Sequence, residues 1–170
     1  PRTSSAASDV YKRQIESLPF MEAIRQLSLE VGYHNHTMMH VTLVPYIQAS
    51  EELKTKPTQH SVMKLREIGL SPDMILCRTD HKLTKDVRNK IGLFGNLNPE
   101  HVIEGSEVKS IYEVPLTLYN QNVSEIIMDR LQLSGKADVS YLKTFIKKFK
   151  EPKHNVNIAM CGKYTELPDA

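Results

Sequence analysis

The sequence is poor in cysteine and has no long hydrophobic run. Its two cysteines, Cys77 and Cys161, lie far apart and neither belongs to a Cys-x-x-Cys pair. A disulfide scaffold or a cysteine-rich zinc site is therefore not indicated, and reduced thiols are the default. No stretch approaches the roughly 18 consecutive apolar residues of a membrane helix, and no charged-then-apolar leader opens the chain. These absences predict a cytoplasmic protein with no membrane partner.

The sequence also has little net charge. Its 22 basic and 20 acidic residues give a formal charge of +2, which argues against a protein that binds nucleic acid or a membrane surface through bulk charge. The rest of the composition, 40% hydrophobic and 25% charged over 170 residues, is that of an ordinary globular domain. Any anion-binding site must therefore be local.

Complete catalytic motifs are absent as well. The sequence contains no Gly-x-x-x-x-Gly-Lys-Ser/Thr, Gly-x-Gly-x-x-Gly, His-Glu-x-x-His or Gly-x-Ser-x-Gly. His34, His36 and His40 offer metal-binding nitrogens, but no carboxylate stands at ligand spacing, which favours turn and sheet-edge histidines. Cys161 could be a nucleophile, yet its apolar strand pattern favours a buried structural thiol. We assign no catalytic residue and no metal ligand.

One segment does carry a chemical signal: residues 54–61 (KTKPTQHS). Pro57 stands where the first residue of a helix is expected, and apolar residues recur at helical spacing from Val62 to Ile68. A helix start presents unpaired N–H groups and a partial positive charge, to which Lys54 and Lys56 add full charges. The combination suits a phosphate; a solvated basic loop before a surface helix is the alternative.

Helical and strand patterns alternate along the first two thirds of the chain. They predict helices over 17–32, 57–68 and 84–95 and strands over 38–45, 73–78 and 101–104, with one apolar face of the first helix buried. This order, with short connections, predicts an α/β fold with a doubly wound parallel sheet. Ligands of such sheets bind beyond the carboxyl ends of the strands. The loops after Pro45, Arg78 and Glu104 should therefore share one rim, and the first of them carries the two lysines.

Further charged residues bear on this rim. Lys90, on the third helix, adds a third cation if its turn faces the rim, and is otherwise a solvated lysine. Arg78 and Asp80 flank a strand end, where their spacing fits either a functional role or a plain surface ion pair. Glu16, ahead of the first helix, either compensates the helix dipole or binds ribose hydroxyls.

The two ends of the chain differ from its middle. Helices are predicted over 116–118, 124–131 and 138–149, followed by a polar hinge with a boundary near Glu151. Residues 156–162 alternate and predict a strand, which we interpret as the first element of a further domain. Residues 1–14 show no apolar period and resemble translated cloning sequence, so we expect a disordered, non-native leader.

The segment 54–61, together with residues 15–26 (IESLPFMEAIRQ), closely resembles CTP synthase. The resemblance runs to Ala170 through residues 40–45 (HVTLVP), 72–78 (PDMILCR), 110–112 (SIY) and 162–170 (GKYTELPDA). It implies that residues 15–150 are the C-terminal part of the synthetase (amidoligase) domain, which is an incomplete P-loop NTPase-like α/β domain with a helical C-terminal part. It also implies that residues 151–170 are the linker and the first strand of a glutamine amidotransferase domain.

The same resemblance implies ligands and their residues. In the family, ATP with Mg²⁺ phosphorylates the uracil O4 of UTP, and ammonia released from glutamine displaces that phosphate to give CTP, which is also an inhibitor. UTP or CTP contacts are implied for Ile15, Glu16, Lys54, Lys56, Gln59 and Lys90. ATP contacts are implied for Arg78 and the backbone of Val108. The family is a homotetramer that binds UTP across a subunit interface.

The chain also departs from the family pattern. Arg13 and Gln14 stand where the family has Gly-Asp. The family's phosphate loop and Mg²⁺-binding acidic residues would precede Ile15, and its glutaminase residues would follow Ala170, so Cys161 is not the glutaminase nucleophile. We expect a fragment that supplies nucleotide contacts and is inactive alone. The alternative is a non-catalytic phosphate- or nucleotide-binding module.

Overall fold

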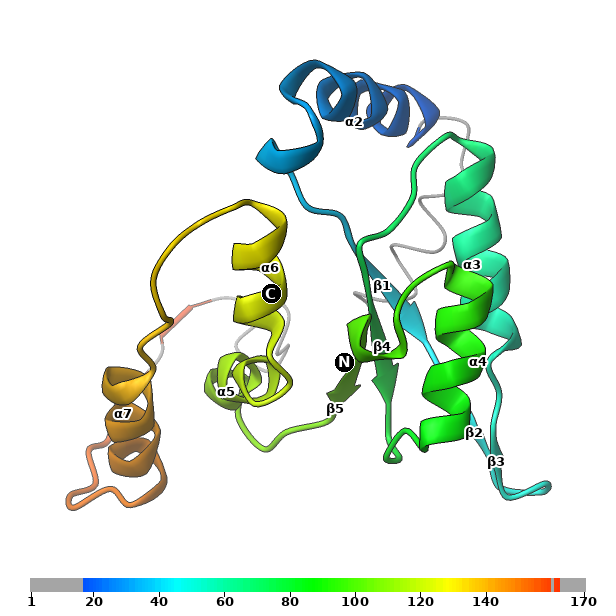
Figure 1. The fold of residues 1–170 in the computed structure, drawn as a ribbon. Coiled ribbons are helices and arrows are strands. Elements are labelled where there is room, and N and C mark those ends of the chain that lie inside the picture. The colour runs from blue at the N-terminus through cyan, green and yellow to red at the C-terminus, as the bar shows by residue number, and fades with distance from the viewer. Residues whose placement is uncertain (1–16, 160, 163–170) are drawn as a thin grey trace. The chain divides into compact units, whose positions relative to one another are not determined.

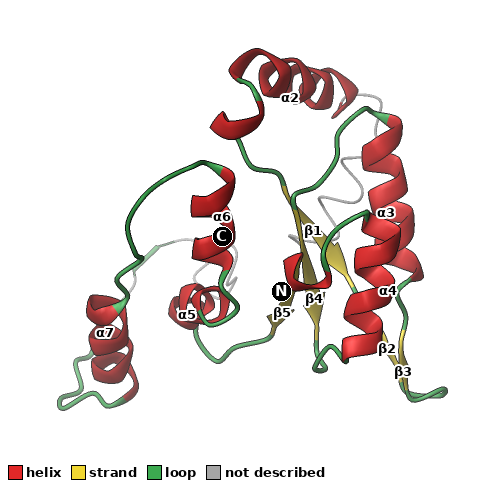
Figure 2. Ribbon diagram, viewed as in Figure 1, coloured by secondary structure: helices red, strands yellow, loops and turns green. Residues whose placement is uncertain are grey.

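Three of the predicted strands form one parallel sheet (Figures 1 and 2). The structure is a computed structural model that describes residues 17–159 and 161–162. In sheet order the strands are β1 (Met39–Leu43), β4 (Met74–Thr79) and β5 (Val102–Ser106). Their carboxyl ends lie side by side, because Arg78 is the register partner of both Leu43 and Gly105. The predicted α/β fold with parallel strands is confirmed, whereas its assignment as P-loop NTPase-like stays a prediction.

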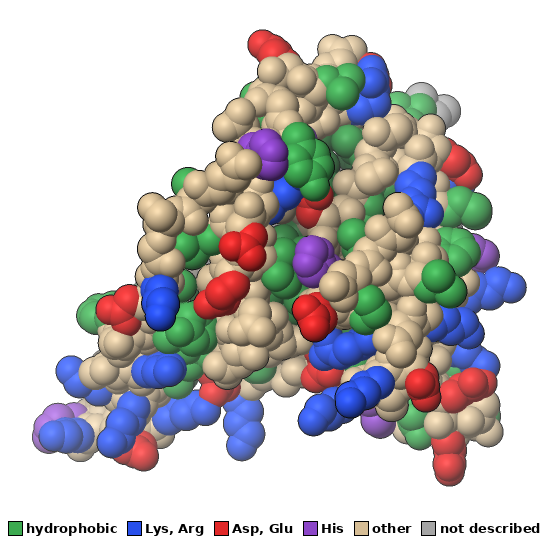
Figure 3. Space-filling model, viewed as in Figure 1, with side chains coloured by type: hydrophobic (Ala, Val, Ile, Leu, Met, Phe, Trp, Pro, Cys, Tyr) green, Lys and Arg blue, Asp and Glu red, His purple; other side chains and the backbone are tan. Residues whose placement is uncertain are grey.

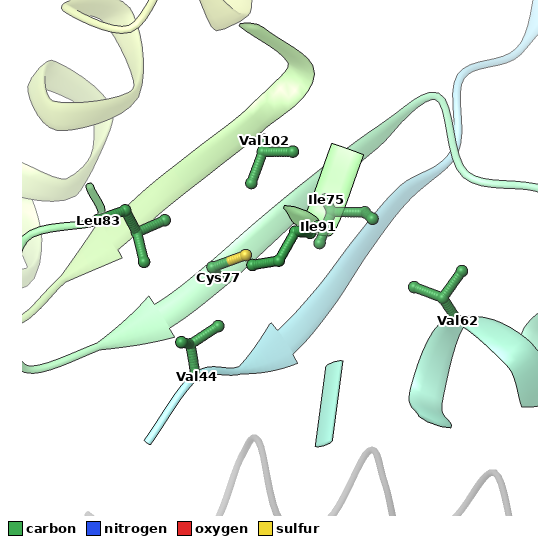
Figure 4. Packing of buried hydrophobic residues seen from close by; sticks show 7 residues of the cluster. All are labelled: Val44, Val62, Ile75, Cys77, Leu83, Ile91 and Val102. Atoms are coloured by element: carbon green, nitrogen blue, oxygen red, sulfur yellow. The ribbon is translucent and has the colours of Figure 1, made fainter. Parts of the chain in front are cut away.

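Both faces of this sheet are covered by helices. Because the side chains of a strand alternate between the two faces, Ile75 and Cys77 join one buried cluster and Met74 joins the other. Figure 4 shows the first cluster, where Ile91 of the helix α4 (Lys85–Gly95) points towards the strand residues. In Figure 1 the helices α3 (Lys56–Glu67) and α4 lie on this face, and α5 (Val114–Tyr119) and α6 (Val123–Arg130) lie on the opposite one. Burial on both faces is why the strands read as nearly continuous apolar runs.

The helices of the first face begin and end close to their predicted bounds. α3 (Lys56–Glu67) carries Pro57 in its first turn and buries one apolar face. α4 (Lys85–Gly95) begins where the Thr84 hydroxyl accepts a hydrogen bond from the Val87 N–H at 3.3 Å. Both starts are therefore determined by local sequence signals.

The second face is covered by α5 (Val114–Tyr119) and α6 (Val123–Arg130), and Gln121 between them attaches this layer to the sheet. The Gln121 carboxamide accepts a hydrogen bond from the Glu104 N–H at 2.8 Å and donates one to the Glu104 carbonyl at 2.8 Å. The side chain thus occupies the edge of β5 in the way a neighbouring strand would.

The remaining elements of this part of the chain are short. β2 (Tyr46–Ile47) and β3 (Glu52–Leu53) form an antiparallel hairpin directly after β1. Single 3₁₀ turns cover Tyr33–Asn35, Pro99–His101 and Ile111–Glu113. The hairpin was not predicted, because strands of two residues are too short to show an alternating pattern.

The first helix, α2 (Leu18–Val31), does not bury its apolar stripe. Phe20 is 72% exposed and Leu27 is 56% exposed, and no residue of the helix is buried. The expectation of a buried face is wrong for the described residues. The spacing of apolar residues specifies a stripe on a helix, but it does not specify which surface covers that stripe.

From Val139 onwards the chain forms a second compact unit. Its helix α7 (Ser140–Lys150) confirms the predicted one. The strand expected over 156–162 is wrong for the described residues of that segment, 156–159 and 161–162, where Val156 and Ile158 are 81% and 83% exposed. A strand requires a hydrogen-bonding neighbour, which an alternating pattern does not supply. The predicted domain boundaries stay a prediction.

None of the helices in the described part of the chain has the length and apolar character needed to cross a membrane.

Candidate functional site

A cleft of about 520 Å³ opens beyond the carboxyl ends of β1 and β4. Its walls come from the β2–β3 hairpin, the loop after β4, the residue before α3, and the helix α4 with the residue before it. They include Tyr46, Glu52, Thr55, His81 and Lys90. A second cleft of similar volume, about 510 Å³, lies beside Arg88 and Gln121, so size does not single out a site. Position does, because the first cleft lies at the rim where ligands of parallel sheets bind.

The start of α3 holds the basic motif against this rim. The Lys54 N–H donates to the Pro45 carbonyl at 2.9 Å, which ties the motif to the end of β1. Lys56 is the first residue of α3 and is exposed. Between the lysines, Thr55 is buried, and its hydroxyl accepts a hydrogen bond from the Gln59 carboxamide at 3.1 Å. The backbone of the motif is therefore fixed while its lysine side chains reach solvent.

Lys90 of α4 lies in the wall of the same cleft. Its turn faces the rim, as the predicted third cation requires. Glu52 of β3 lines the cleft too, and the Lys54 ammonium donates a hydrogen bond to its carboxylate. This bond holds the pKa of Glu52 below its ordinary value, and the charge of Lys90 acts in the same direction. In Figure 3 acidic and basic side chains lie beside one another at the lower right, where Figure 1 shows the β2–β3 hairpin and the nearby end of α4.

Arg78 stands at the end of β4 but on the other face of the sheet. Cys77 faces the cluster of α3 and α4, whereas Leu76 packs against the cluster of α5 and α6, so Arg78 takes the side of Leu76. Val108 is half-buried and follows the end of β5. Neither Arg78 nor Val108 lines the cleft that contains Lys90. Of the predicted residues that the structure describes, Lys90 alone is among those that line this cleft, and Lys54 contacts its lining residue Glu52. Lys56 and Gln59 are not among the lining residues.

The remaining sequence candidates lie elsewhere. Ile15 and Glu16 fall outside the described residues. Cys161 is exposed, so the expectation of a buried structural thiol is wrong for it. Cys77 is buried in the core, and this burial raises the pKa of its thiol to about 11, which keeps it protonated at neutral pH.

The three histidines near the start of β1 are engaged separately. His34 and His36 each hydrogen-bond through Nδ1 to a backbone carbonyl, at 3.3 and 3.0 Å, and His40 Nε2 lies 3.0 Å from the buried Ser61 hydroxyl. Within the described residues, no three His, Cys, Asp or Glu side chains come together as metal ligands.

Sequence patterns missed two features of the cleft. The rings of Tyr46 and His81 stack with 3.8 Å between their centroids, joining the segment after β1 to the loop after β4. The hairpin, which was not predicted, brings the Glu52 carboxylate into contact with Lys54. The only sequence signal for either feature was its position in or beside a predicted rim loop.

Taken together, the fold and the cleft define an open parallel α/β protein whose cleft at the carboxyl ends of the strands is lined by both acidic and basic side chains. Residues 12–133 match the family model described as CTP synthase N-terminus. The chain belongs to the CTP synthase family.

Three curated relatives, each named CTP synthase, illustrate the match. The chain is 52% identical over 157 residues to the protein of Caldanaerobacter subterraneus subsp. tengcongensis, 50% over 159 residues to that of Chloroherpeton thalassium, and 49% over 157 residues to that of Aquifex aeolicus. Each match covers 92% of this chain and 28% to 30% of the relative. The chain thus spans less than a third of the relatives' length.

Proposed function

We propose that this chain is part of a CTP synthase and that its cleft binds UTP, or CTP as an inhibitor. In the proposed reaction ATP phosphorylates the uracil O4 of UTP, and glutamine-derived ammonia displaces that phosphate to form CTP. The nucleotide-binding residues are proposed to be Ile15, Glu16, Lys54, Lys56, Gln59 and Lys90.

The observation that supports this proposal most strongly is that Lys90 and Glu52, the partner of Lys54, line one cleft at the rim. Lys54 lies between β3 and α3, Lys56 is the first residue of α3, and Lys90 comes from the next crossover helix. Their ammonium groups would place positive charge around a rim site, which suits the several negative charges of a triphosphate. Lysine binds phosphate as a compact point charge with three donors.

We further propose that Arg78 and the backbone of Val108 contact ATP. Their placement away from the lysine cleft suits a second nucleotide bound at the same rim. We assign the ligands of the Mg²⁺ ion to the rest of the protein and derive no step through the metal. The 170 residues are thus proposed to bind nucleotides without catalysing the reaction alone.

The homotetramer expected from the resemblance is also a proposal, with α2 as part of the contact between copies. Its support is the apolar stripe of α2, where Phe20 and Leu27 are 72% and 56% exposed. Contiguous exposed apolar surface commonly marks an interaction site. Sedimentation velocity over a concentration series tests this proposal, and Phe20→Ser should weaken assembly. A species of one 19.4 kDa chain at every concentration would contradict it.

Calorimetric titration of UTP into the 170-residue chain tests the nucleotide site. Lys54→Ala and Lys90→Ala should each weaken UTP binding about tenfold or more, because a hydrogen bond to a charged group contributes about 1.5–3 kcal/mol. Lys64→Ala is the matched control, since Lys64 lies on α3 and pairs with Glu67 at 2.5 Å. Unchanged UTP affinity in Lys54→Ala would refute the assignment.

A parallel titration with inorganic triphosphate separates this proposal from its alternative. Tighter binding of UTP than of triphosphate supports a site that recognises the pyrimidine nucleotide. Equal affinity for the two ligands favours a non-catalytic phosphate-binding module.

A further inference from the structure

Glu52 places a carboxylate beside two lysines, Lys54 and Lys90, which are called the lysine cluster below. Glu52 and Lys54 are two positions apart in an extended segment, so their side chains share one side of it. The hairpin register pairs Glu52 with Ile47, and the hydrogen bond from the Lys54 N–H to the Pro45 carbonyl continues this ladder at 2.9 Å. The backbone therefore holds the acidic and the basic side chain next to each other.

The interactions of Glu52 come from more than one element. Lys54 donates a hydrogen bond to its carboxylate, and the two side chains are 44% and 51% exposed. Lys90 attracts the same carboxylate from α4 and, after the larger effect of Lys54, helps to hold its pKa low. Glu52 is consequently ionised at neutral pH and neutralises part of the charge of the lysine cluster.

We infer that Glu52 is a built-in competitor of the phosphate groups, which occupies Lys54 in the unliganded protein and is displaced when a triphosphate binds. The inference rests on the proposed function. A phosphate that approaches Lys54 meets the negative charge of Glu52 on the same ammonium group, and like charges repel. Glu52 thereby lowers the affinity of the site for the nucleotide, so that a higher nucleotide concentration is needed to fill it.

The opposite role for Glu52 is that of a positioning residue, which would hold Lys54 ready for the phosphate. The two roles predict opposite signs. Removing a competitor tightens nucleotide binding, whereas removing a positioning residue weakens it. A single neutral substitution therefore decides between them.

Titration of UTP into Glu52→Gln is that experiment. UTP should bind about 1.4- to fivefold more tightly than to the wild-type chain, the range that corresponds to exposed ion pairs of about 0.2–1 kcal/mol. The gain should shrink as salt rises from about 0.05 to 0.5 M, because counterions screen exposed charges. Glu52→Ala removes the same charge without the carboxamide and should tighten binding likewise.

Two controls test whether the effect of Glu52→Gln is specific to its contact with Lys54. Glu67→Gln breaks an exposed lysine–glutamate pair at the far end of α3 and should leave UTP affinity unchanged. In a Lys54→Ala background, Glu52→Gln should lose most of its effect, because the two residues act through one contact.

The possible results separate the inference from the proposed function. Weaker or unchanged UTP binding in Glu52→Gln overturns the inference even if Lys54→Ala behaves as proposed. Absence of UTP binding to the wild-type chain, or no loss in Lys54→Ala, overturns the proposed nucleotide site and the inference with it.

Discussion

Replacing Gln121 with leucine should detach the α5–α6 layer from the edge of the sheet. The wild-type carboxamide makes hydrogen bonds of 2.8 Å to both the N–H and the carbonyl of Glu104. It also accepts a hydrogen bond from Arg88 Nη2 and donates one to the Thr117 carbonyl, each at 3.2 Å. Leucine has a similar size but can make none of these bonds.

The structure sets the magnitude of the effect. A typical intramolecular hydrogen bond contributes about 0.5–1.5 kcal/mol net, and a buried group left without a partner costs more. Gln121 is only half-buried, so water can replace part of what is lost. We expect a loss of about 2–3 kcal/mol, which is a large share of the about 5–15 kcal/mol that stabilises a typical domain.

Urea denaturation with amide hydrogen exchange measures this loss and its location. The urea midpoint should fall, and the Glu104 N–H should exchange about 30- to 140-fold faster, since 1.4 kcal/mol corresponds to a factor of ten. Gln26→Leu is the control, because Gln26 is exposed and its side chain donates a hydrogen bond of 2.8 Å to Glu22. A loss in Gln121→Leu no larger than in this control, or unchanged exchange at Glu104, would refute the reasoning.

Three further predictions concern the core, the thiols and pH. Ile91→Ala should cost about 2–5 kcal/mol of unfolding free energy in urea, because Ile91 is 1% exposed, whereas Phe20→Ala on the exposed stripe should cost the isolated chain little. A thiol reagent should label Cys161 rapidly in the folded protein and Cys77 only on unfolding; equal rates would contradict the burial of Cys77. Hydrogen bonds, first from the Arg25 guanidinium, lower the pKa of Glu22 to about 2, so its stabilising effect is present above about pH 4.5 and is lost as pH falls towards 2. The difference in urea midpoint between wild type and Glu22→Gln should therefore shrink over that interval, and a constant difference would contradict the assignment.

Much of the fold could be predicted from local patterns. The strands containing Ile75 and Val102 are apolar runs, and Thr84 and Gly95 mark the ends of a helix within a few residues. These signals depend only on residues that are close together in the sequence, so they can be recognised without a structure. Their alternation also predicts parallel strands and a rim that carries the basic motif, because short crossovers leave few alternatives.

The composition of the site depended on contacts between distant residues. The position of Glu52 among lysines from two elements required the hairpin, and the stack of Tyr46 on His81 required two loops to meet. No periodic pattern encodes such meetings.

The amino-acid order alone was thus sufficient for the helices, the parallel strands and the place of the basic motif. Tertiary structure decided which side chains share the cleft, how Gln121 closes the edge of β5, and that the stripe of α2 is exposed. The physical reason is range: caps and apolar spacing act within one element, whereas packing and charge pairing join residues that are neighbours only after the chain has folded.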